Sequence, residues 1–202
     1  MIKTKILQIL IDGQKDFIDG ALPNTEAQKK LPNLKQRIRQ HDGVTIATHD
    51  THFNKIQVTS NWPPAYQTEG IAYEDSYEHK FAGLPAHCIK LTPGWEIHPE
   101  LLKVLQEKNV DGQKKFFAID KYTFGWTGWK DYLKDFEFEE IELFGFCTDI
   151  CVVSNALMLR ALFPNMKITV VENCCAGVTP ELHEAALKVM ESCQITVLRE
   201  AA

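Results

Sequence analysis

Three residues able to carry out covalent catalysis follow apolar runs of this chain: Cys151 in "LFGFCTDICVVSNAL", Asp12 after "ILQILI" and Lys121 in "FFAIDKYTFGW". A cysteine can act as nucleophile, a partly desolvated aspartate can take its proton, and a lysine ammonium can stabilise an oxyanion. Covalent acyl transfer needs these three parts. Each residue alone also has a structural explanation, because cysteine packs in cores, aspartate caps turns and lysine is commonly solvated.

The surroundings of Cys151 suit a nucleophile. Thr148 or Asp149 is a good helix N-cap, and an apolar helical pattern follows over 150–162. The start of a helix favours a thiolate, and its free backbone N–H groups can bind an oxyanion. We therefore expect Cys151 in the first turn of a helix.

A second group of residues suits a metal ion. The stretch "THDTHF" places Asp50 and His52 two residues apart, and "LPAHC" offers His87 in the following loop. Carboxylate and imidazole ligands suit zinc, iron or manganese without choosing among them, although such residues are also common as solvated loop side chains. The other candidates are expected to be structural, with His49, His98 and His183 as surface or capping residues and Cys174 and Cys175 packed below the site.

The elements that must position these residues alternate between two patterns. Continuous apolar runs, typical of strands buried on both faces, occur over 6–12, 44–50, 115–121, 140–146, 167–173 and 194–198. Amphipathic helical patterns lie near 30–41, 98–108, 127–135, 150–162 and 180–193. This alternation predicts an α/β fold with three layers, in which a doubly wound, six-stranded, mainly parallel sheet carries helices on both faces. Ligands bind beyond the carboxyl ends of the strands of such sheets.

The length of 202 residues favours a single domain over 1–202. Only the stretch 51–97 breaks the alternation, because it is rich in proline, glycine and other turn residues. A connection of this length inside a compact domain is usually functional or mobile. We therefore expect an irregular active-site loop region there.

Composition excludes several classes of partner. The net charge is −5 and the lysines are dispersed among acidic residues, which predicts no binding of nucleic acid. No apolar run approaches the ~20 residues that span a bilayer. Six cysteines in a chain with an adequate core and no secretory signal are expected to be thiols, and the expected compartment is the cytoplasm.

Beyond these patterns, the chain resembles the nicotinamidase/isochorismatase-like cysteine hydrolases along nearly its whole length. The matching motifs are "DGQKDF" (12–17), "HDTH" (49–52), "HCIKLTPGWEIHPEL" (87–101), the strand end at Lys121, "GFCTDICV" (145–152) and "NCCAGVTPELHEAAL" (173–187). The resemblance implies an isochorismatase-like fold and a catalytic set of Asp12, Lys121 and Cys151. It also implies an oxyanion hole of backbone N–H groups around the cysteine turn and a cis peptide bond between Phe146 and Cys147.

The resemblance further implies a divalent metal ion beside the catalytic set, held by the three candidate ligands named above. The family's usual additional histidine would align near Val58, which cannot coordinate a metal. Some members supply a glutamate later in the loop, and the expected ligand here is Glu78, with His79 and Asp75 as alternatives. For the substrate, the resemblance implies contacts from Gln14, Phe17, Trp62 and Tyr66, although 53–80 is the least matched region.

Together these observations predict a metal-assisted cysteine amidase for a small planar carboxamide. Its first candidate reaction converts nicotinamide to nicotinate and ammonia through a thioester. Two alternatives remain: another hydrolase of the family, either a ureido or carbamoyl amidase or an isochorismatase-like enzyme, and a non-catalytic ligand-binding relative. Members of the family often form homo-oligomers, and Trp126 and Trp129, placed at i and i+3 of a helix, could form a contact patch or pack in the core.

Overall fold

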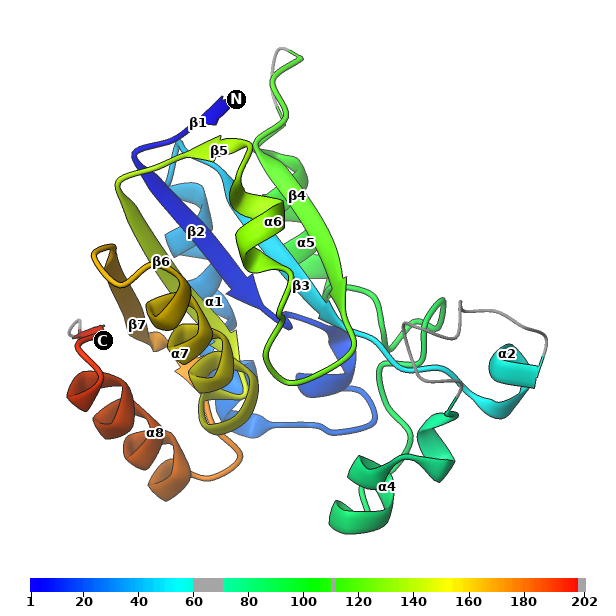
Figure 1. Ribbon diagram of the computed structural model, residues 1–202. Coiled ribbons are helices and arrows are strands. Elements are labelled where there is room, and N and C mark those ends of the chain that lie inside the picture. Colours follow the sequence, from blue (N-terminus) through cyan, green and yellow to red (C-terminus); the bar gives the residue numbers. More distant parts are fainter. Residues whose placement is uncertain (60–70, 110–111, 200–202) are drawn as a thin grey trace.

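Six parallel strands form the centre of the computed structural model, which describes residues 1–59, 71–109 and 112–199 (Figure 1). Their order across the sheet is β4-β3-β2-β6-β7-β8, and every neighbouring pair is parallel. The strands are β2 (Ile6–Ile11), β3 (Thr45–Asp50), β4 (Phe116–Lys121), β6 (Glu140–Phe146), β7 (Lys167–Ala176) and β8 (Thr196–Leu198). All six correspond to the apolar runs of the sequence.

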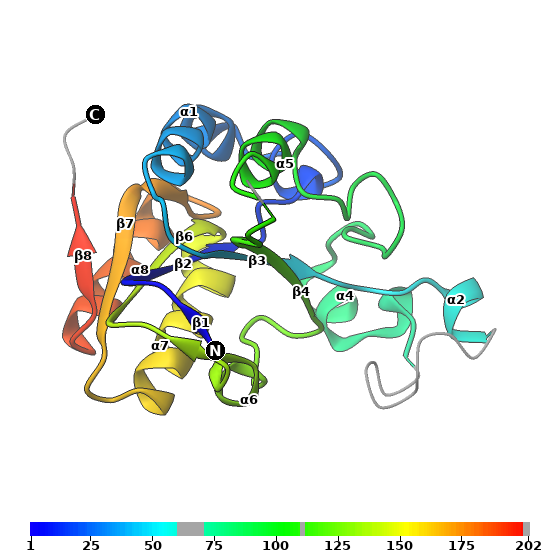
Figure 2. The same ribbon diagram turned by 90° about the horizontal axis from the view of Figure 1, so that it is seen from above.

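Helices cover both faces of this sheet, as Figure 2 shows most directly. One face carries α1 (Thr25–Arg39) and α5 (Pro99–Gln106). The other carries α6 (Trp129–Leu133), α7 (Val153–Leu162) and α8 (Pro180–Ser192). The predicted three-layer, doubly wound α/β fold is therefore confirmed.

The chain reverses its direction across the sheet between β2 and β6. From β2 it proceeds outward through β3 to β4, and then returns to place β6 on the other side of β2. The register pairs Ile6 with Glu140 and Ile11 with Gly145. Loops diverge from such a switch point, which leaves a crevice beyond the carboxyl ends of the two strands. Asp12 and the cysteine turn both lie there.

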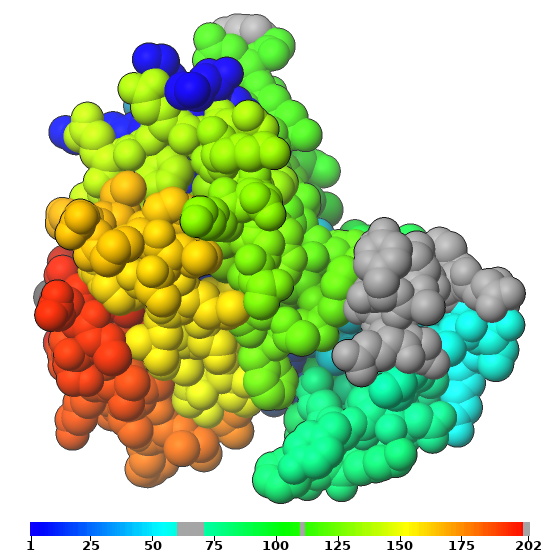
Figure 3. Space-filling view, viewed as in Figure 1, coloured from blue at the N-terminus to red at the C-terminus, as the bar shows by residue number. Residues whose placement is uncertain are grey.

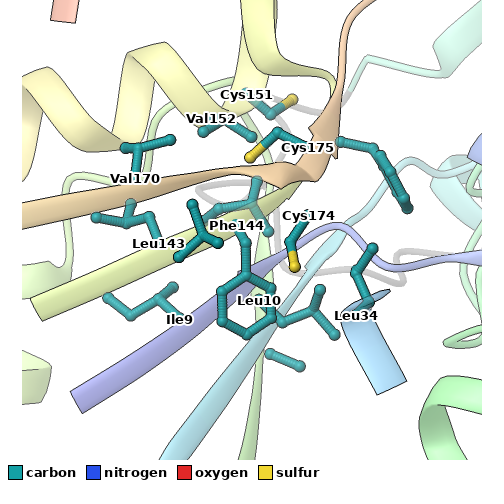
Figure 4. Close-up of a cluster of buried hydrophobic side chains, with 14 of the residues drawn as sticks. Ile9, Leu10, Leu34, Leu143, Phe144, Cys151, Val152, Val170, Cys174 and Cys175 are labelled. Atoms are coloured by element: carbon teal, nitrogen blue, oxygen red, sulfur yellow. The ribbon is translucent and has the colours of Figure 1, made fainter. Parts of the chain in front are cut away.

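Apolar side chains from the central strands fix these strand ends. Figure 4 shows Ile9 and Leu10 of β2 beside Leu143 and Phe144 of β6, all without solvent exposure. Each such side chain contributes about 1.5 to 3 kcal/mol through its burial. Two thiols of β7 complete this cluster, since Cys174 and Cys175 are 2% and 0% exposed. They pack as small apolar groups.

The sequence misplaced some boundaries. Helix α1 begins at Thr25, five residues before the expected start, because the side chain of Asn24 accepts hydrogen bonds from the backbone of Glu26 and Ala27. A second sheet, of β1 (Ile2–Lys3) and β5 (Phe136–Glu137), was not predicted. Strands of two residues are too short to show a hydrophobic period.

The irregular stretch contains short helical segments instead of regular layers. They are α2 (Lys55–Thr59), a 3₁₀ turn (Tyr73–Asp75) and α4 (Tyr77–Ala82). Figure 1 shows α2 and α4 beside the carboxyl ends of β3 and β4, away from the body of the sheet. None of the helices in the described part of the chain is long and apolar enough to cross a membrane.

The two tryptophans of the proposed contact patch do not share a helix. Trp129 begins α6, whereas Trp126 lies before it, and their rings meet edge to face at 5.0 Å. Trp129 is fully buried, and its indole N–H donates to Asn155 Oδ1 at 2.8 Å. Of the two alternatives, a contact patch or core packing, the structure therefore supports core packing for Trp129.

Candidate active site

The ammonium of Lys121 joins the three residues of the predicted catalytic set. Its Nζ atom lies 2.8 Å from Asp12 Oδ2 and 3.5 Å from Cys151 Sγ. Asp12 and Lys121 are fully buried and Cys151 is 5% exposed. Because their strands end at one edge of a parallel sheet, residues that are far apart in the sequence meet in a single cluster.

A threonine that sequence reasoning missed holds Asp12. Thr48 Oγ1 donates to Asp12 Oδ1 at 2.6 Å and accepts from the backbone N–H of Asp12 at 3.0 Å. The aspartate has a φ of 48°, in the left-handed region that Asp tolerates better than most residues. Thr48 thus fixes both the backbone and the carboxylate of Asp12.

Burial sets the resting charges of this cluster. It raises the pKa of Asp12, although Lys121 and Thr48 act in the opposite direction. It also raises the pKa of the Cys151 thiol well above its ordinary value, against the effect of Lys121. For Lys121, burial opposes the charge, but the nearby carboxylates outweigh it and the pKa is raised. The thiol therefore keeps its proton until a neighbouring base accepts it.

Next to this cluster lie the predicted metal ligands. One donor atom from each of Asp50, His52 and His87 lies within 4.8 Å of the others. Asp50 Oδ2 is 2.9 Å from His52 Nε2 and 3.7 Å from His87 Nε2. Glu78 faces both rings, at 3.8 Å from His52 Nε2 and 3.5 Å from His87 Nε2. Two imidazoles and two carboxylates are a donor set that fits zinc, iron or manganese.

Two details favour metal binding over an ordinary ion-pair network. The Nδ1 atom of His87 donates to the Pro85 carbonyl at 3.0 Å, which leaves Nε2 free to coordinate. Burial lowers the pKa of His87, which favours the neutral ring that coordinates a metal. The alternative ligands point elsewhere, because His79 Nδ1 donates to the Leu84 carbonyl and Asp75 pairs with Lys55.

Asp50 belongs to both clusters. Its Oδ2 atom faces the histidines, while Oδ1 lies 3.1 Å from Nζ of Lys121. Although burial opposes its ionisation, Lys121 and His52 hold the pKa of Asp50 well below its ordinary value. One buried ammonium therefore balances Asp12 and Asp50, which couples the candidate metal site to the candidate nucleophile.

Gln14 positions Asp50 instead of contacting the cavity. Its side chain accepts from the backbone N–H of Asp50 at 2.7 Å and donates to the carbonyls of Asp50 and Trp95, each at 2.8 Å. The residue is fully buried and its polar atoms are used. The expected substrate contact from Gln14 is therefore corrected to a positioning role.

The cysteine turn differs from the expected simple helix start. The peptide bond between Phe146 and Cys147 is cis, and Thr148–Val152 forms a π-helical turn that continues into α7. Cys147 occupies the N-cap position without a side-chain cap. The expectation that Thr148 or Asp149 caps this helix is wrong, because Thr148 bonds to His183 and Asp149 accepts from the backbone N–H of Val178.

Two neighbours hold this turn in place. A Cβ at Gly145 would lie 2.0 Å from the carbonyl oxygen of Ile11, so only glycine permits this approach of β6 to the end of β2. On the other side, the amide of Asn155 donates to the carbonyl of Cys151 at 2.8 Å, and its oxygen accepts from Trp126 and Trp129. Sequence reasoning missed Asn155, which stands next to Ser154 in a mostly apolar helix and carries no local sign of its role.

A cavity of about 1570 Å³ connects the cysteine with the metal ligands. Figure 3 shows it opening between the teal segment around α4 and the body of the molecule. Phe17 lines this cavity, as expected for an aromatic wall, whereas Trp62 and Tyr66 lie outside the described residues. The charged residues of the described lining are acidic or histidine, without lysine or arginine, and the acids are Glu26, Asp50, Glu78 and Asp149.

The three histidines that were expected to be surface or capping residues differ in their roles. His98 caps α5, since its Nδ1 accepts from the backbone N–H of Glu100 at 3.4 Å. His49 is 7% exposed and stacks on Trp95 at 4.6 Å, so it is a buried residue and not a surface one. His183 is 9% exposed and bonds to Thr148.

A parallel α/β sheet with a buried aspartate, lysine and cysteine beyond its strand ends is the arrangement that the resemblance to isochorismatase-like hydrolases implies. Comparison with known proteins agrees. The isochorismatase domain family matches residues 7–202, and the chain belongs to this family.

Named relatives are similar over most of their length. The chain is 28% identical over 196 residues to a nicotinamidase of Escherichia coli (strain K12), covering 91% of this chain and 88% of the relative. It is 29% identical over 161 residues to a nicotinamidase of Acinetobacter baylyi, covering 74% of this chain and 72% of the relative. Among solved structures, the pyrazinamidase of Pyrococcus horikoshii in complex with zinc shares the fold, with a TM-score of 0.73 and 21% sequence identity. The match covers 98% of this chain and 100% of that structure's chain.

Proposed function

We propose that this protein is a metal-assisted cysteine amidase whose first candidate substrate is nicotinamide, which it converts to nicotinate and ammonia. It is a hydrolase of amide C–N bonds, in keeping with its family and with the nicotinamidases that it is similar to. The observation that carries the finer proposal is the buried contact of Lys121 with both Asp12, at 2.8 Å, and Cys151, at 3.5 Å.

The chemistry follows from the charges of this cluster. Asp12 takes the thiol proton of Cys151, and the thiolate attacks the amide carbonyl carbon. Lys121 and backbone N–H groups of the cysteine turn stabilise the oxyanion of the tetrahedral intermediate. The C–N bond of the intermediate then breaks, and the nitrogen takes the proton from Asp12. Ammonia departs, and the acyl group stays on Cys151 as a thioester. Water then loses a proton to Asp12 and attacks the thioester carbonyl carbon. The C–S bond breaks, the carboxylic acid is released, and the Cys151 thiolate takes the proton back from Asp12.

A divalent metal fits the donor set of Asp50, His52, His87 and Glu78. The solved pyrazinamidase in complex with zinc supports such a site at the level of the fold. When bound, the ion would supply a Lewis acid that can hold a ring nitrogen of the substrate. The ligand residues themselves orient the site, because Asp50 also touches Lys121 and Gln14 holds the backbone of Asp50.

The charge of the cavity favours a neutral substrate. Four carboxylates line it, and its described residues include no lysine or arginine. These carboxylates would repel an anionic substrate of the isochorismate kind, whereas they would not repel a neutral carboxamide. A ureido or carbamoyl amidase is the second candidate, because a neutral ureido group would fit the same charges.

Turnover of a panel of carboxamides by the metal-loaded protein tests the proposal. Ammonia release and product mass are measured for nicotinamide, pyrazinamide, benzamide and a ureido compound. Cys151→Ala is expected to abolish ammonia release, while Cys193→Ala, which changes a thiol outside the cavity, is expected to behave as the parent. A Cys151→Ala protein that works at the parental rate would refute the mechanism.

Labelling with iodoacetamide separates the enzyme from a non-catalytic binding protein. The rate of alkylation at each cysteine is followed by mass spectrometry at neutral pH. An enzyme is expected to show Cys151 reacting faster than Cys193, since Asp12 can accept its proton. Equal rates would favour the binding protein. The expected homo-oligomer stays a prediction, and size-exclusion chromatography with light scattering tests it.

A further inference from the structure

A second polar network lies behind the cysteine turn, outside the catalytic and metal clusters. Thr148 Oγ1 and His183 Nδ1 are 2.8 Å apart. Thr148 is fully buried and His183 is 9% exposed. His183 lies in the first half of α8, whereas Thr148 comes directly after Cys147, whose peptide bond to Phe146 is cis. Neither side chain lines the described cavity.

Glu172 lies beside the other nitrogen of the histidine ring. Its Oε1 atom lies 3.5 Å from His183 Nε2 and 3.6 Å from Nζ of Lys30. A carboxylate beside Nε2 favours the proton on that nitrogen. His183 Nδ1 is then the acceptor, and the hydroxyl of Thr148 donates to it. The network thus links the cysteine turn to β7, α8 and α1.

The connection between β7 and α8 is packed against the same turn. Asp149 Oδ1 accepts from the backbone N–H of Val178 at 2.9 Å. A Cβ at Gly177 would lie 2.8 Å from Asp149 Oδ1 and 2.9 Å from His183 Cβ, so the backbone there approaches both residues closely. Two successive residues of the turn, Thr148 and Asp149, are therefore anchored to the segment that begins α8.

We propose that His183 is a positioning residue of the hydrolase. Through its hydrogen bond to Thr148 it holds the turn that places Cys151 Sγ against the ammonium of Lys121. This inference rests on the proposed function, because it assigns His183 to the same reaction. A displacement of the nucleophile by a fraction of an ångström is costly for catalysis, whereas binding of a small substrate in a wide cavity is less sensitive.

Two substitutions at position 183 separate positioning from packing. His183→Leu removes the acceptor and leaves the Thr148 hydroxyl without its partner. His183→Asn retains an oxygen near the position of Nδ1. The loss of one such hydrogen bond is expected to lower kcat for nicotinamide about tenfold in the leucine variant, with KM within about twofold of the parent. The asparagine variant is expected to restore most of kcat.

A measurement without substrate keeps the test independent of the assigned reaction. The alkylation rate of Cys151 by iodoacetamide is expected to change about tenfold in His183→Leu but little in His183→Asn, with Cys193 as an unchanged internal reference. If the parent does not hydrolyse nicotinamide, the proposed function fails. The alkylation rate of Cys151 relative to that of Cys193 still decides whether His183 positions the nucleophile.

Two results would overturn the inference. The first is a His183→Leu variant whose kcat and Cys151 alkylation rate equal those of the parent. Even if the thermal midpoint of that variant fell, the histidine would then be purely structural. Should that variant fail to fold, Thr148→Val replaces it as a nearly isosteric change, compared with Thr148→Ser as its matched control. Equal kinetics in Thr148→Val and Thr148→Ser would likewise contradict a role for this hydrogen bond.

Discussion

Thr48→Val tests the assignment of Asp12 as the general base without touching the reacting residues. Valine has nearly the shape of threonine, so the change removes two hydrogen bonds and little packing. In the protein, Thr48 donates to Asp12 Oδ1 at 2.6 Å and accepts from Asp12 N at 3.0 Å, and both residues are fully buried. A hydrogen bond to a buried carboxylate contributes about 1.5 to 3 kcal/mol. Urea unfolding is expected to show a loss of this size.

The pH profile supplies the sharper test. The Thr48 hydrogen bond lowers the pKa of Asp12, so its removal raises that pKa further. A base must be ionised, so the acid limb of kcat/KM is expected to move to higher pH. On that limb the rate should fall by about ten- to a hundredfold, while Thr48→Ser retains the parental profile. An unmoved acid limb together with the expected loss of stability would refute Asp12 as the group that controls it.

Three further changes probe the rest of the site. Lys121→Met removes the ammonium that Asp12 and Asp50 share, so it should abolish turnover and lower the free energy of unfolding in urea by about 3 to 5 kcal/mol. An unchanged midpoint would contradict the buried ion pairs. Gln14→Leu removes the hydrogen bonds that hold the backbone of Asp50. Elemental analysis should then find less bound metal after dialysis, and an unchanged metal content would argue against the positioning of Asp50 by Gln14. The His52→Ala variant should lose the bound metal ion, whereas the surface control Asp75→Asn should retain it. Equal metal contents in the two variants would show that His52 is not a metal ligand.

The sheet was predictable because its strands are buried on both faces. A strand of that kind is a short continuous apolar run, and β2 and β6 stand out between polar segments. Parallel strands then bring their carboxyl ends to one edge, so Asp12 and Lys121 could be expected to meet. The chemistry of the site thus followed from the residue types at strand ends.

The supporting residues were not predictable, for physical reasons. Thr48 and Asn155 act through hydrogen bonds across the fold, and neither shows a pattern in the local sequence. The resemblance implied a substrate contact from Gln14, whereas its side chain turns inward to Asp50. Glu78 was expected only through the family resemblance, because it lies on an irregular loop that hydrophobic periodicity does not describe.

The pairing of β2 with β6 has a consequence for biosynthesis. Gln8 and Glu142 are neighbours in the folded sheet but 134 positions apart along the chain. At ~5 to 20 residues per second, a ribosome needs on the order of ten seconds to extend the nascent polypeptide between them. During that interval one edge of the apolar strand "ILQILI" lacks its neighbour and is open to aggregation. Chaperone dependence during translation, followed by late and abrupt acquisition of activity, is the expected outcome.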